Sequence, residues 1–147
     1  MNEKEHEFAE KMNKRLDETT NIYVKYNDEE EAFSIYYIYR YKKRPINENR
    51  LKDSDEIAWE LTRPEVLHAV DEYNFAAQMN KKLDENAKMY VRYSIDEDFF
   101  ETYHTTRFKK RPIDESKLEG SDMISNFLTR EDVEDDVYSY KLGFNNK

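Results

Sequence analysis

Cysteine is absent from this chain, and glycine occurs only twice, at Gly120 and Gly143. The lack of cysteine excludes disulfides, thiol nucleophiles and cysteine-based zinc sites. The scarcity of glycine excludes phosphate-binding loops and dinucleotide fingerprints, which need several glycines. No apolar run approaches the roughly 18 residues of a membrane span, and the charged N-terminal stretch lacks the apolar segment of a signal peptide. We therefore expect no membrane segment and a cytoplasmic location.

The chain also lacks a recognisable catalytic constellation. His6, His68 and His104 fall in different predicted elements, and none shows metal-ligand spacing with carboxylates. The 33 acidic residues are typical of solvated helix faces. The acidic stretch 28–31 lacks the alternating ligands and the glycine of an EF-hand loop. We therefore expect no enzymatic activity, no cofactor and no bound metal.

Charge, by contrast, is abundant. Charged residues make up 39% of the chain, and 33 acidic against 24 basic residues give a net charge of −9. Such a composition can signal disorder, but 14% of the residues are aromatic, 12 of them tyrosine, and aromatics can bury large areas. An acidic protein is repelled by nucleic-acid backbones and attracted to basic protein surfaces. The richness in Lys, Asn, Glu, Ile and Tyr suits an AT-rich genome, such as that of a low-GC bacterium or its phage.

The sequence repeats itself with an offset of 67 residues, because Phe8 corresponds to Phe75 and the match continues without a gap. EFAEKMNKRLDETTNIYVKY aligns with NFAAQMNKKLDENAKMYVRY, and YRYKKRPINENRL aligns with TRFKKRPIDESKL. About 30 of the 63 positions aligned from residue 8 onward are identical, which indicates one supersecondary unit used twice. A unit of this size buries only a thin core alone, so we expect the copies to pack together.

Each copy begins with a predicted helix and a predicted strand. Apolar residues at helical spacing predict an amphipathic helix, namely Phe8, Ala9, Met12 and Leu16, repeated as Phe75, Ala76, Met79 and Leu83. Alternating apolar residues then predict a strand, namely Ile22, Val24 and Tyr26, repeated as Met89, Val91 and Tyr93. An acidic stretch follows, where we expect a turn because Asp and Glu disfavour strands.

A second strand is predicted to begin near Ala32 and to run to the KKRP segment, where Pro45 cannot donate to a ladder. Ser54-Asp55 then predicts the N-cap of a short helix that carries Ile57 and Leu61. The same features recur in the second copy at Phe99, Pro112, Ser121-Asp122, Ile124 and Leu128.

A longer helix is predicted to join the two copies. Thr62-Arg63-Pro64-Glu65 forms a capping box with proline in the first turn, and Thr129-Arg130-Glu131-Asp132 is its counterpart. No glycine or proline interrupts residues 65–87. One helix over about 63–87 is therefore expected to end the first copy and begin the second.

The predicted fold class is α+β, a tandem duplication of a helix-strand-strand-helix-helix unit with antiparallel hairpins covered by helices. Residues 1–67 form repeat one and residues 68–147 form repeat two. We expect the two repeats to pack as one compact, pseudo-two-fold domain that shares the long helix.

A basic cluster is the most distinctive polar feature that both repeats keep. It consists of Arg40, Lys42, Lys43 and Arg44, and of Arg107, Lys109, Lys110 and Arg111. One interpretation is an anion site for phosphate, nucleic acid or an acidic protein. The other is that these cations offset nearby carboxylates and protect a sheet edge from aggregation.

The second strand differs between the repeats, since AFSIYYIYRY in repeat one corresponds to FFETYHTTRF in repeat two. Both faces of the first version are apolar or aromatic, which indicates either a partner surface or a central strand covered on both sides. The predicted partner surface consists of Tyr36, Tyr37, Tyr39 and Trp59, the acidic residues Asp28, Glu29, Glu30 and Glu31, and their counterparts Asp96, Glu97 and Asp98.

The function expected from these features is that of a small acidic, non-enzymatic protein that binds a protein with a basic surface. Small acidic proteins of phages or mobile elements often block nucleases in this way, in some cases by mimicking DNA. The alternative is a nucleic-acid-binding module in which the KKRP segments grip phosphates and tyrosines such as Tyr36 and Tyr103 stack on bases. The net charge argues against this alternative, and the sequence does not indicate an oligomeric state.

Overall fold

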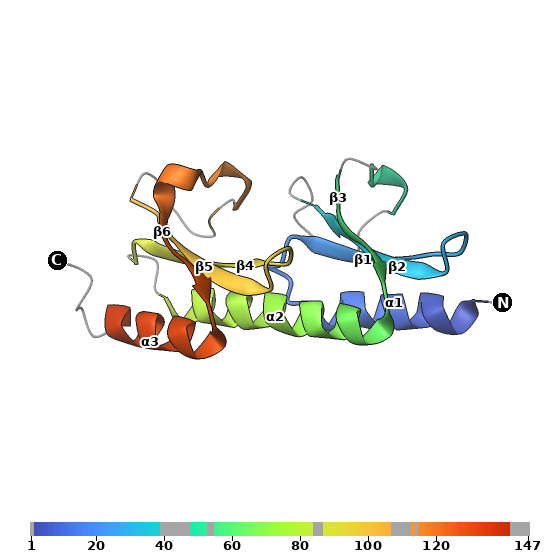
Figure 1. The fold of residues 1–147 in the computed structure, drawn as a ribbon, viewed down its shortest axis with the longest axis horizontal. Helices are drawn as coiled ribbons and strands as arrows, with labels where there is room; N and C mark the ends of the chain where they lie inside the picture. The colour runs from blue at the N-terminus through green and yellow to red at the C-terminus, as the bar shows by residue number, and fades with distance from the viewer. Residues whose placement is uncertain are drawn as a thin grey trace. The chain divides into compact units, whose positions relative to one another are not determined.

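The chain divides into two compact units, Met1–Glu72 and Tyr73–Lys147, each drawn in Figure 1. The structure is a computed structural model that describes residues 2–38, 48–52, 55–83, 87–106, 113 and 115–141. Each unit contains one three-stranded antiparallel sheet, and with three α-helices in the described residues this confirms the α+β class. The division into repeats at residue 67 and the packing of the repeats into one domain both stay predictions.

Unit one contains a helix, three strands and the first part of a second helix. In chain order these are α1 (Glu3–Arg15), β1 (Ile22–Asn27), β2 (Ala32–Tyr37), the 3-10 turn η1 (Glu48–Arg50), β3 (Glu56–Leu61) and α2 (Arg63–Lys82). The sheet order is β1-β2-β3, so β2 is the central strand.

The predicted helix and strand patterns of repeat one hold in the structure. Ala9, Met12 and the C-cap residue Leu16 are buried, and α1 packs on β1. Alternate residues of β1 are buried, as a strand with one covered face requires. The first turn of α1 is acidic and its last turn is basic, which complements the helix dipole.

A single asparagine fixes α1 to the edge of the sheet. The Nδ2 of Asn13 donates to the carbonyl oxygen of Val24 at 2.8 Å, and the backbone N–H of Val24 donates to Oδ1 of Asn13 at 2.7 Å. Asn80 on α2 makes the same pair of hydrogen bonds with Val91, at 2.8 Å each. The amide thus replaces a neighbouring strand and satisfies two backbone groups that an edge strand leaves unpaired.

Unit two contains the second part of α2, three strands and a final helix. The elements after α2 are β4 (Met89–Ser94), β5 (Phe99–His104), the 3-10 turns η3 (Glu115–Lys117) and η4 (Gly120–Asp122), β6 (Met123–Leu128) and α3 (Arg130–Lys141). The sheet order is β4-β5-β6. Residues of α2, β4, β5 and α3 form one buried core cluster, which consists of Ala76, Met79, Leu83, Met89, Val91, Tyr93, Phe100, Val133, Val137 and Tyr140.

The short helix predicted in each repeat is wrong, because residues 56–61 and 123–128 form the strands β3 and β6. The four-residue spacing of Ile57 and Leu61 suggested a helix. A spacing of four residues fits one face of a helix and equally one face of a strand. The strand also contains a β-bulge, since Phe33 pairs with Leu61 but Ile35 pairs with Ala58. The extra residue interrupts the period-two pattern, so each repeat is a helix, three strands and a helix.

Two predicted boundaries also change. The strands β2 and β5 end at Tyr37 and His104, before the predicted end at the KKRP segments, which lie outside the described residues. The long helix α2 ends at Lys82 instead of residue 87. No helix in the described part of the chain is long and apolar enough to cross a membrane.

The predicted helix caps are confirmed. The backbone N–H of Thr62 donates to Oε1 of Glu65 at 3.0 Å, directly before α2. Before α3, the N–H of Thr129 donates to Oδ2 of Asp132 at 3.0 Å, and the N–H of Asp132 donates to the Thr129 hydroxyl at 3.2 Å. These bonds satisfy backbone N–H groups that the first turn of a helix leaves without helical partners.

We predict that Asn13→Ala lowers the free energy of unfolding by about 1–3 kcal/mol, because it removes both partners of a half-buried backbone unit. Asn13→Asp keeps an acceptor for the Val24 N–H but places a carboxylate oxygen against the Val24 carbonyl oxygen, so it should not restore the stability of the wild type. Urea unfolding and amide hydrogen exchange at Val24 measure the effect. Asn126→Ala, on an exposed residue of β6, is the control, and an equal loss there would contradict the proposed anchor.

Candidate interaction surface

The turn between β1 and β2 carries four consecutive acidic residues, 28–31. All four are exposed. The Asp28 carboxylate accepts a hydrogen bond from Asn2 Nδ2 at 3.2 Å, and its oxygens lie 2.9 and 3.0 Å from Nε2 of His6. Glu31 ends the turn with φ 52°. The N-terminal part of α1 therefore orders one carboxylate of the turn and leaves the rest at the surface.

The same contacts shift the titration of Asp28. Hydrogen bonds from His6 and then Asn2 hold the pKa of the Asp28 carboxyl below its ordinary value. A carboxyl with a depressed folded pKa stabilises the fold above its unfolded pKa, and this contribution disappears as the pH falls through the folded pKa. The contact is at the surface, so salt screens it.

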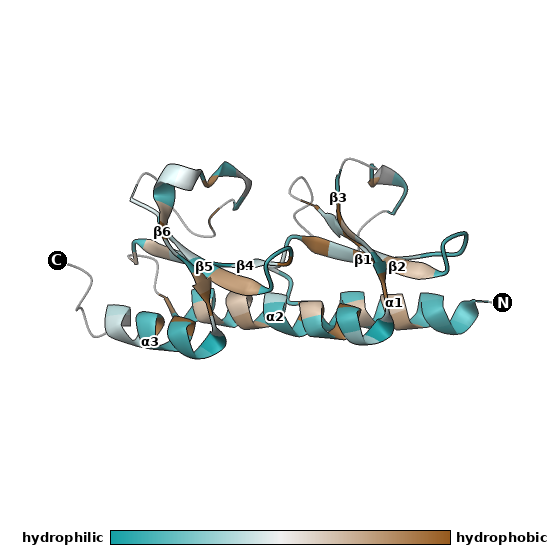
Figure 2. Cartoon of the chain, in the orientation of Figure 1, coloured by the Kyte–Doolittle hydropathy of each residue, from teal (hydrophilic) through white to brown (hydrophobic). Residues whose placement is uncertain are grey.

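The turn between β4 and β5 is the acidic counterpart in unit two. Asp96, Glu97 and Asp98 are exposed, and Figure 2 shows the turn in the hydrophilic colour. The Tyr93 hydroxyl donates to Oδ1 of Asp98 at 2.6 Å, and the N–H of Asp98 donates to the carbonyl oxygen of Ser94 at 2.8 Å. Asp98 thus closes its turn, while Asp96 and Glu97 form no ion pair with any described residue.

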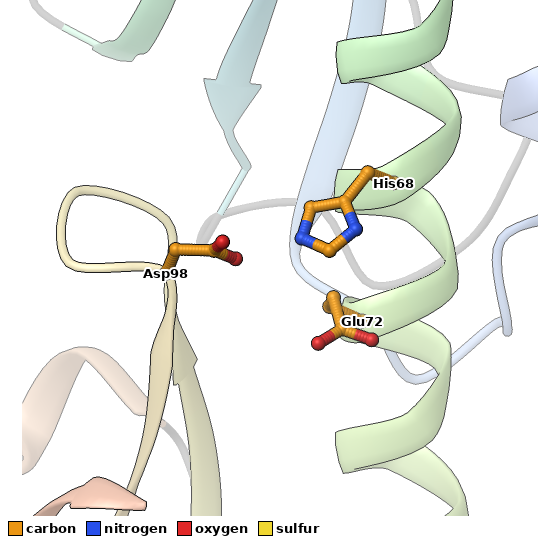
Figure 3. Close-up of side chains that lie close together, drawn as sticks. All are labelled: His68, Glu72 and Asp98. Carbon is orange, nitrogen blue, oxygen red and sulfur yellow. The ribbon is translucent and has the colours of Figure 1, made fainter. Parts of the chain in front are cut away.

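Figure 3 labels His68 and Glu72, which project from α2, and Asp98, which ends the turn between β4 and β5. His68 and Glu72 lie on successive turns of α2, where His68 is exposed and Glu72 is buried. The sequence analysis did not group His68 with any carboxylate. Its spacing of four residues from Glu72 places both side chains on one face of the helix.

The residues of the predicted aromatic surface in unit one differ in exposure. Tyr36 is buried, at 6% exposure, and Tyr37 is half-buried, as the central position of β2 requires. Tyr103 is also buried, so in this fold neither Tyr36 nor Tyr103 presents a ring on which a base could stack. Trp59 on β3 is 59% exposed. The side chain of Tyr39 lies outside the described residues.

The basic cluster also lies outside the described residues. This applies to all of its members: Arg40, Lys42, Lys43, Arg44, Arg107, Lys109, Lys110 and Arg111. The two interpretations of the cluster, an anion site or charge compensation at a sheet edge, therefore stay predictions.

A depression of about 780 Å³ borders α1 and β1 in unit one. Its lining includes His6, Glu10, Lys14 and Tyr23. Lys14 pairs with Glu10 at 3.2 Å, and His6 pairs with Asp28. His6, Glu10 and Lys14 are therefore already engaged in ion pairs at the border of this depression.

Unit two contains a buried polar network that the sequence did not indicate. The Glu101 carboxylate accepts hydrogen bonds from the Tyr103 hydroxyl at 2.7 Å and from Nη1 of Arg92 at 3.2 Å. The guanidinium also approaches Glu115 at 3.6 Å, and the Tyr90 hydroxyl donates to Glu115 at 3.1 Å. Glu101 is buried, so Arg92 provides the positive charge that a buried carboxylate requires.

The network contains two carboxylates and one guanidinium. Burial raises the pKa of Glu115, and the charge of Arg92 partly offsets this rise. Burial also raises the pKa of the Tyr103 hydroxyl, with a further contribution from its hydrogen bond to Glu101. Every polar group of the network has a partner inside it, which is typical of a structural network that joins β4, β5 and η3.

An exposed aromatic pair in unit two was also missed by the sequence reasoning. Phe99 at the start of β5 and Phe127 near the end of β6 are 37% and 57% exposed, and their ring centroids lie 5.7 Å apart. The aromatic residues predicted to form the partner surface all belong to repeat one. In the alignment, Ala32 and Glu60 occupy the equivalent positions, so the comparison of the repeats contained the signal.

We predict that His6→Ala raises the pKa of Asp28 towards its ordinary value, because the strongest hydrogen bond to the carboxylate is lost. Carboxyl carbon chemical shifts measured against pH report the titration directly. His104→Ala, which removes an exposed histidine of unit two, should leave the titration of Asp28 unchanged. An unchanged Asp28 midpoint in His6→Ala would contradict the assigned contact.

We predict that Arg92→Met destabilises the protein by roughly 2–4 kcal/mol at pH 7, less than for a fully buried pair because the Arg92 side chain is 43% exposed. The pKa of Glu115 is already above its unfolded value, and it rises further without Arg92. Stability is then lost as the pH rises from the unfolded towards the folded pKa, so the penalty should be smaller in acid. Urea unfolding at several pH values measures it.

The matched control is Lys25→Met, because Lys25 occupies the position of Arg92 in unit one and faces Ser34 instead of a carboxylate. Its effect should be small and independent of pH. An equal, pH-independent loss in both variants would show that Arg92 contributes packing and not charge.

Comparison with known proteins assigns no family or function to this chain. No protein-family model matches the chain, and neither a curated protein nor a solved structure matches it. The functional argument therefore depends on the residues described above.

Proposed function

We propose that this chain is a non-enzymatic module that binds another protein through that protein's basic surface. The observation that carries the proposal is the pair of ordered acidic turns. In each, one aspartate is fixed, Asp28 by His6 and Asp98 by Tyr93. Its acidic neighbours remain exposed, so carboxylates are presented on a defined backbone.

The net charge of −9 supports the same proposal. A negative field accelerates the encounter with a positively charged partner and rejects acidic ones. Charged residues at the rim of an interface influence association rate and specificity more than affinity. The acidic turns would therefore choose and orient the partner, and apolar contacts would supply most of the affinity.

The proposed partner is a nucleic-acid-handling enzyme such as a nuclease, because such enzymes present basic grooves to phosphates. Carboxylates at the surface of a protein can occupy these grooves as a mimic of DNA. The proposed source is a phage or mobile element, and the proposed place of action is the cytoplasm.

We further infer that the chain is a tandem duplication. Positive-φ residues support this, because Glu31 and Asp98 differ by the alignment offset, as do Glu60 and Phe127. The β-bulges of β3 and β6 have the same register at that offset. Two similar units would allow one partner to be contacted at two places.

We predict that reversing the exposed charges of both turns weakens partner binding by about tenfold or more. The variant is Glu29→Lys, Glu30→Lys, Asp96→Lys and Glu97→Lys, which keeps the turn-closing aspartates. The wild-type chain is immobilised, retained proteins from a bacterial lysate are identified, and the affinity of the retained protein for each variant is measured by interferometry at several salt concentrations.

The control variant reverses four exposed carboxylates on helices and loops, at Glu7, Glu18, Glu134 and Asp135, and has the same net charge. The proposal requires a retained basic protein that the turn variant loses and the control keeps. Displacement of that protein by duplex DNA supports mimicry. Equal losses of affinity in both variants would show that net charge, and not the acidic turns, determines binding. Direct binding of DNA by the wild-type chain would favour the nucleic-acid alternative.

A further inference from the structure

We propose that Phe99 and Phe127, with the acidic turn 96–98, form a docking surface for a basic protein segment that carries an apolar anchor residue. The inference rests on the proposed function and deepens it, because it assigns the partner contact to one face of unit two. It also states what the partner must present, namely one large apolar side chain with lysines or arginines beside it.

The two rings form a compact pair at the surface. Their centroids lie 5.7 Å apart with an interplanar angle of 81°, the edge-to-face arrangement that aromatic rings prefer. Phe99 is 37% and Phe127 is 57% exposed, in a chain whose other phenylalanine on this sheet, Phe100, is fully buried. The pair offers a preformed apolar contact, and Phe99 directly follows the acidic turn 96–98.

The backbone conformation at Phe127 is unusual for a phenylalanine. Phe127 has φ 55°, the left-handed region that bulky side chains rarely adopt and that glycine or asparagine adopts more easily. It lies in the bulge of β6, where Phe100 pairs with Leu128 but Thr102 pairs with Ser125. A bulge re-aims a side chain, and here it directs an aromatic ring to the surface. Folding alone gives no reason for phenylalanine at this position.

The surroundings of the pair are acidic. Asp98 directly precedes Phe99 in the chain, and Asp96 and Glu97 are exposed without an ion pair to a described residue. The nearest described cation in the sequence, Arg130, is engaged, because its guanidinium lies 4.8 Å from the ring centroid of Phe75. An apolar centre with a charged rim is the usual anatomy of a protein interface.

Charge complementarity selects the occupant. Carboxylates beside the rings favour lysine and arginine on the partner and repel phosphates. A second copy of this chain is disfavoured, because a symmetric contact would place the same acidic turn of each copy against the other. A basic protein segment with an apolar residue satisfies both the rings and the carboxylates.

Unit one provides a natural comparison. Its aligned positions carry Ala32 and Glu60, and Glu60 has the same left-handed backbone, with φ 55°. The bulge therefore belongs to both units, whereas the aromatic pair belongs to unit two alone. The acidic turn of unit one can attract basic chains, but it lacks the apolar contact beside it.

The test uses two synthetic peptides as probes of the full-length chain. Both are lysine-rich and equal in charge, and one has a central leucine where the other has serine. We expect the leucine peptide to bind about tenfold more tightly, as burial of one leucine side chain allows. In nitrogen-15 NMR titrations it should shift the amides of Phe99, Phe127 and residues 96–98 before those of residues 28–31.

The decisive variant is Phe99→Ala with Phe127→Glu, which installs the residues of unit one. Attraction by charge alone would make this variant bind more tightly, because it gains a negative charge. The proposed surface predicts the opposite, a loss of the preference for leucine. If the double variant is unfolded, Phe127→Asn replaces it, because asparagine removes the ring and tolerates the left-handed backbone. Trp59→Asn in unit one is the control and should leave the preference for the leucine peptide unchanged.

Three outcomes would overturn the docking surface. If both peptides bind equally and shift the amides of both acidic turns, the docking surface is wrong. The proposal of a partner with a basic surface is then unaffected. Absence of binding by either peptide at low salt would count against the proposed function as well. Self-association of the wild-type chain in sedimentation velocity, lost in the double variant, would identify a second copy as the occupant.

Discussion

The structure depends on the pairing of an asparagine amide with the edge of a sheet. Asn13 and Asn80 each satisfy both backbone groups of one valine, Val24 and Val91. These two bonds fix how far the helix is rotated and shifted along the strand, which hydrophobic contacts alone do not specify. The edge strand also loses two groups with which another chain could pair. One polar side chain thus sets the helix position and protects the sheet.

The position of the helix in turn decides how each acidic turn is ordered. In unit one, His6 lies two helical turns before the anchor and reaches the carboxylate of Asp28. In unit two, the aligned residue is Tyr73, which packs edge-to-face on Tyr93 at 5.0 Å, as His6 packs on Tyr26 at 5.2 Å. Tyr93 then holds Asp98. The two units use different side chains for the same result, a turn with one fixed carboxylate and exposed neighbours.

Much of the fold was predictable, because the patterns concerned were local. Helix faces, the first hairpin and the caps at Thr62 and Thr129 follow from spacing and residue type. The third strand was not predictable in this way, because the four-residue spacing of Ile57 and Leu61 fits a helix as well as a strand. The bulge at Glu60 also interrupts the alternation that would have indicated a strand. The role of Asn13 was equally hidden, since an amide on a helix resembles a solvated residue until the strand beside it is known.

The candidate site was harder to predict because it lies where the repeats differ, and among the differing positions the aromatic strand of repeat one was predicted to be the partner surface. Arg92 and Glu101 are direct cross-strand partners and align with Lys25 and Ser34, which are also cross-strand partners. Opposite charges on two neighbouring strands at the same level indicate a contact. The same reasoning applies to the aromatic pair of unit two, whose second ring occupies a backbone position unfavourable to it. Residues shared by the repeats explain folding, so a specialised surface is best sought among paired changes that folding does not require.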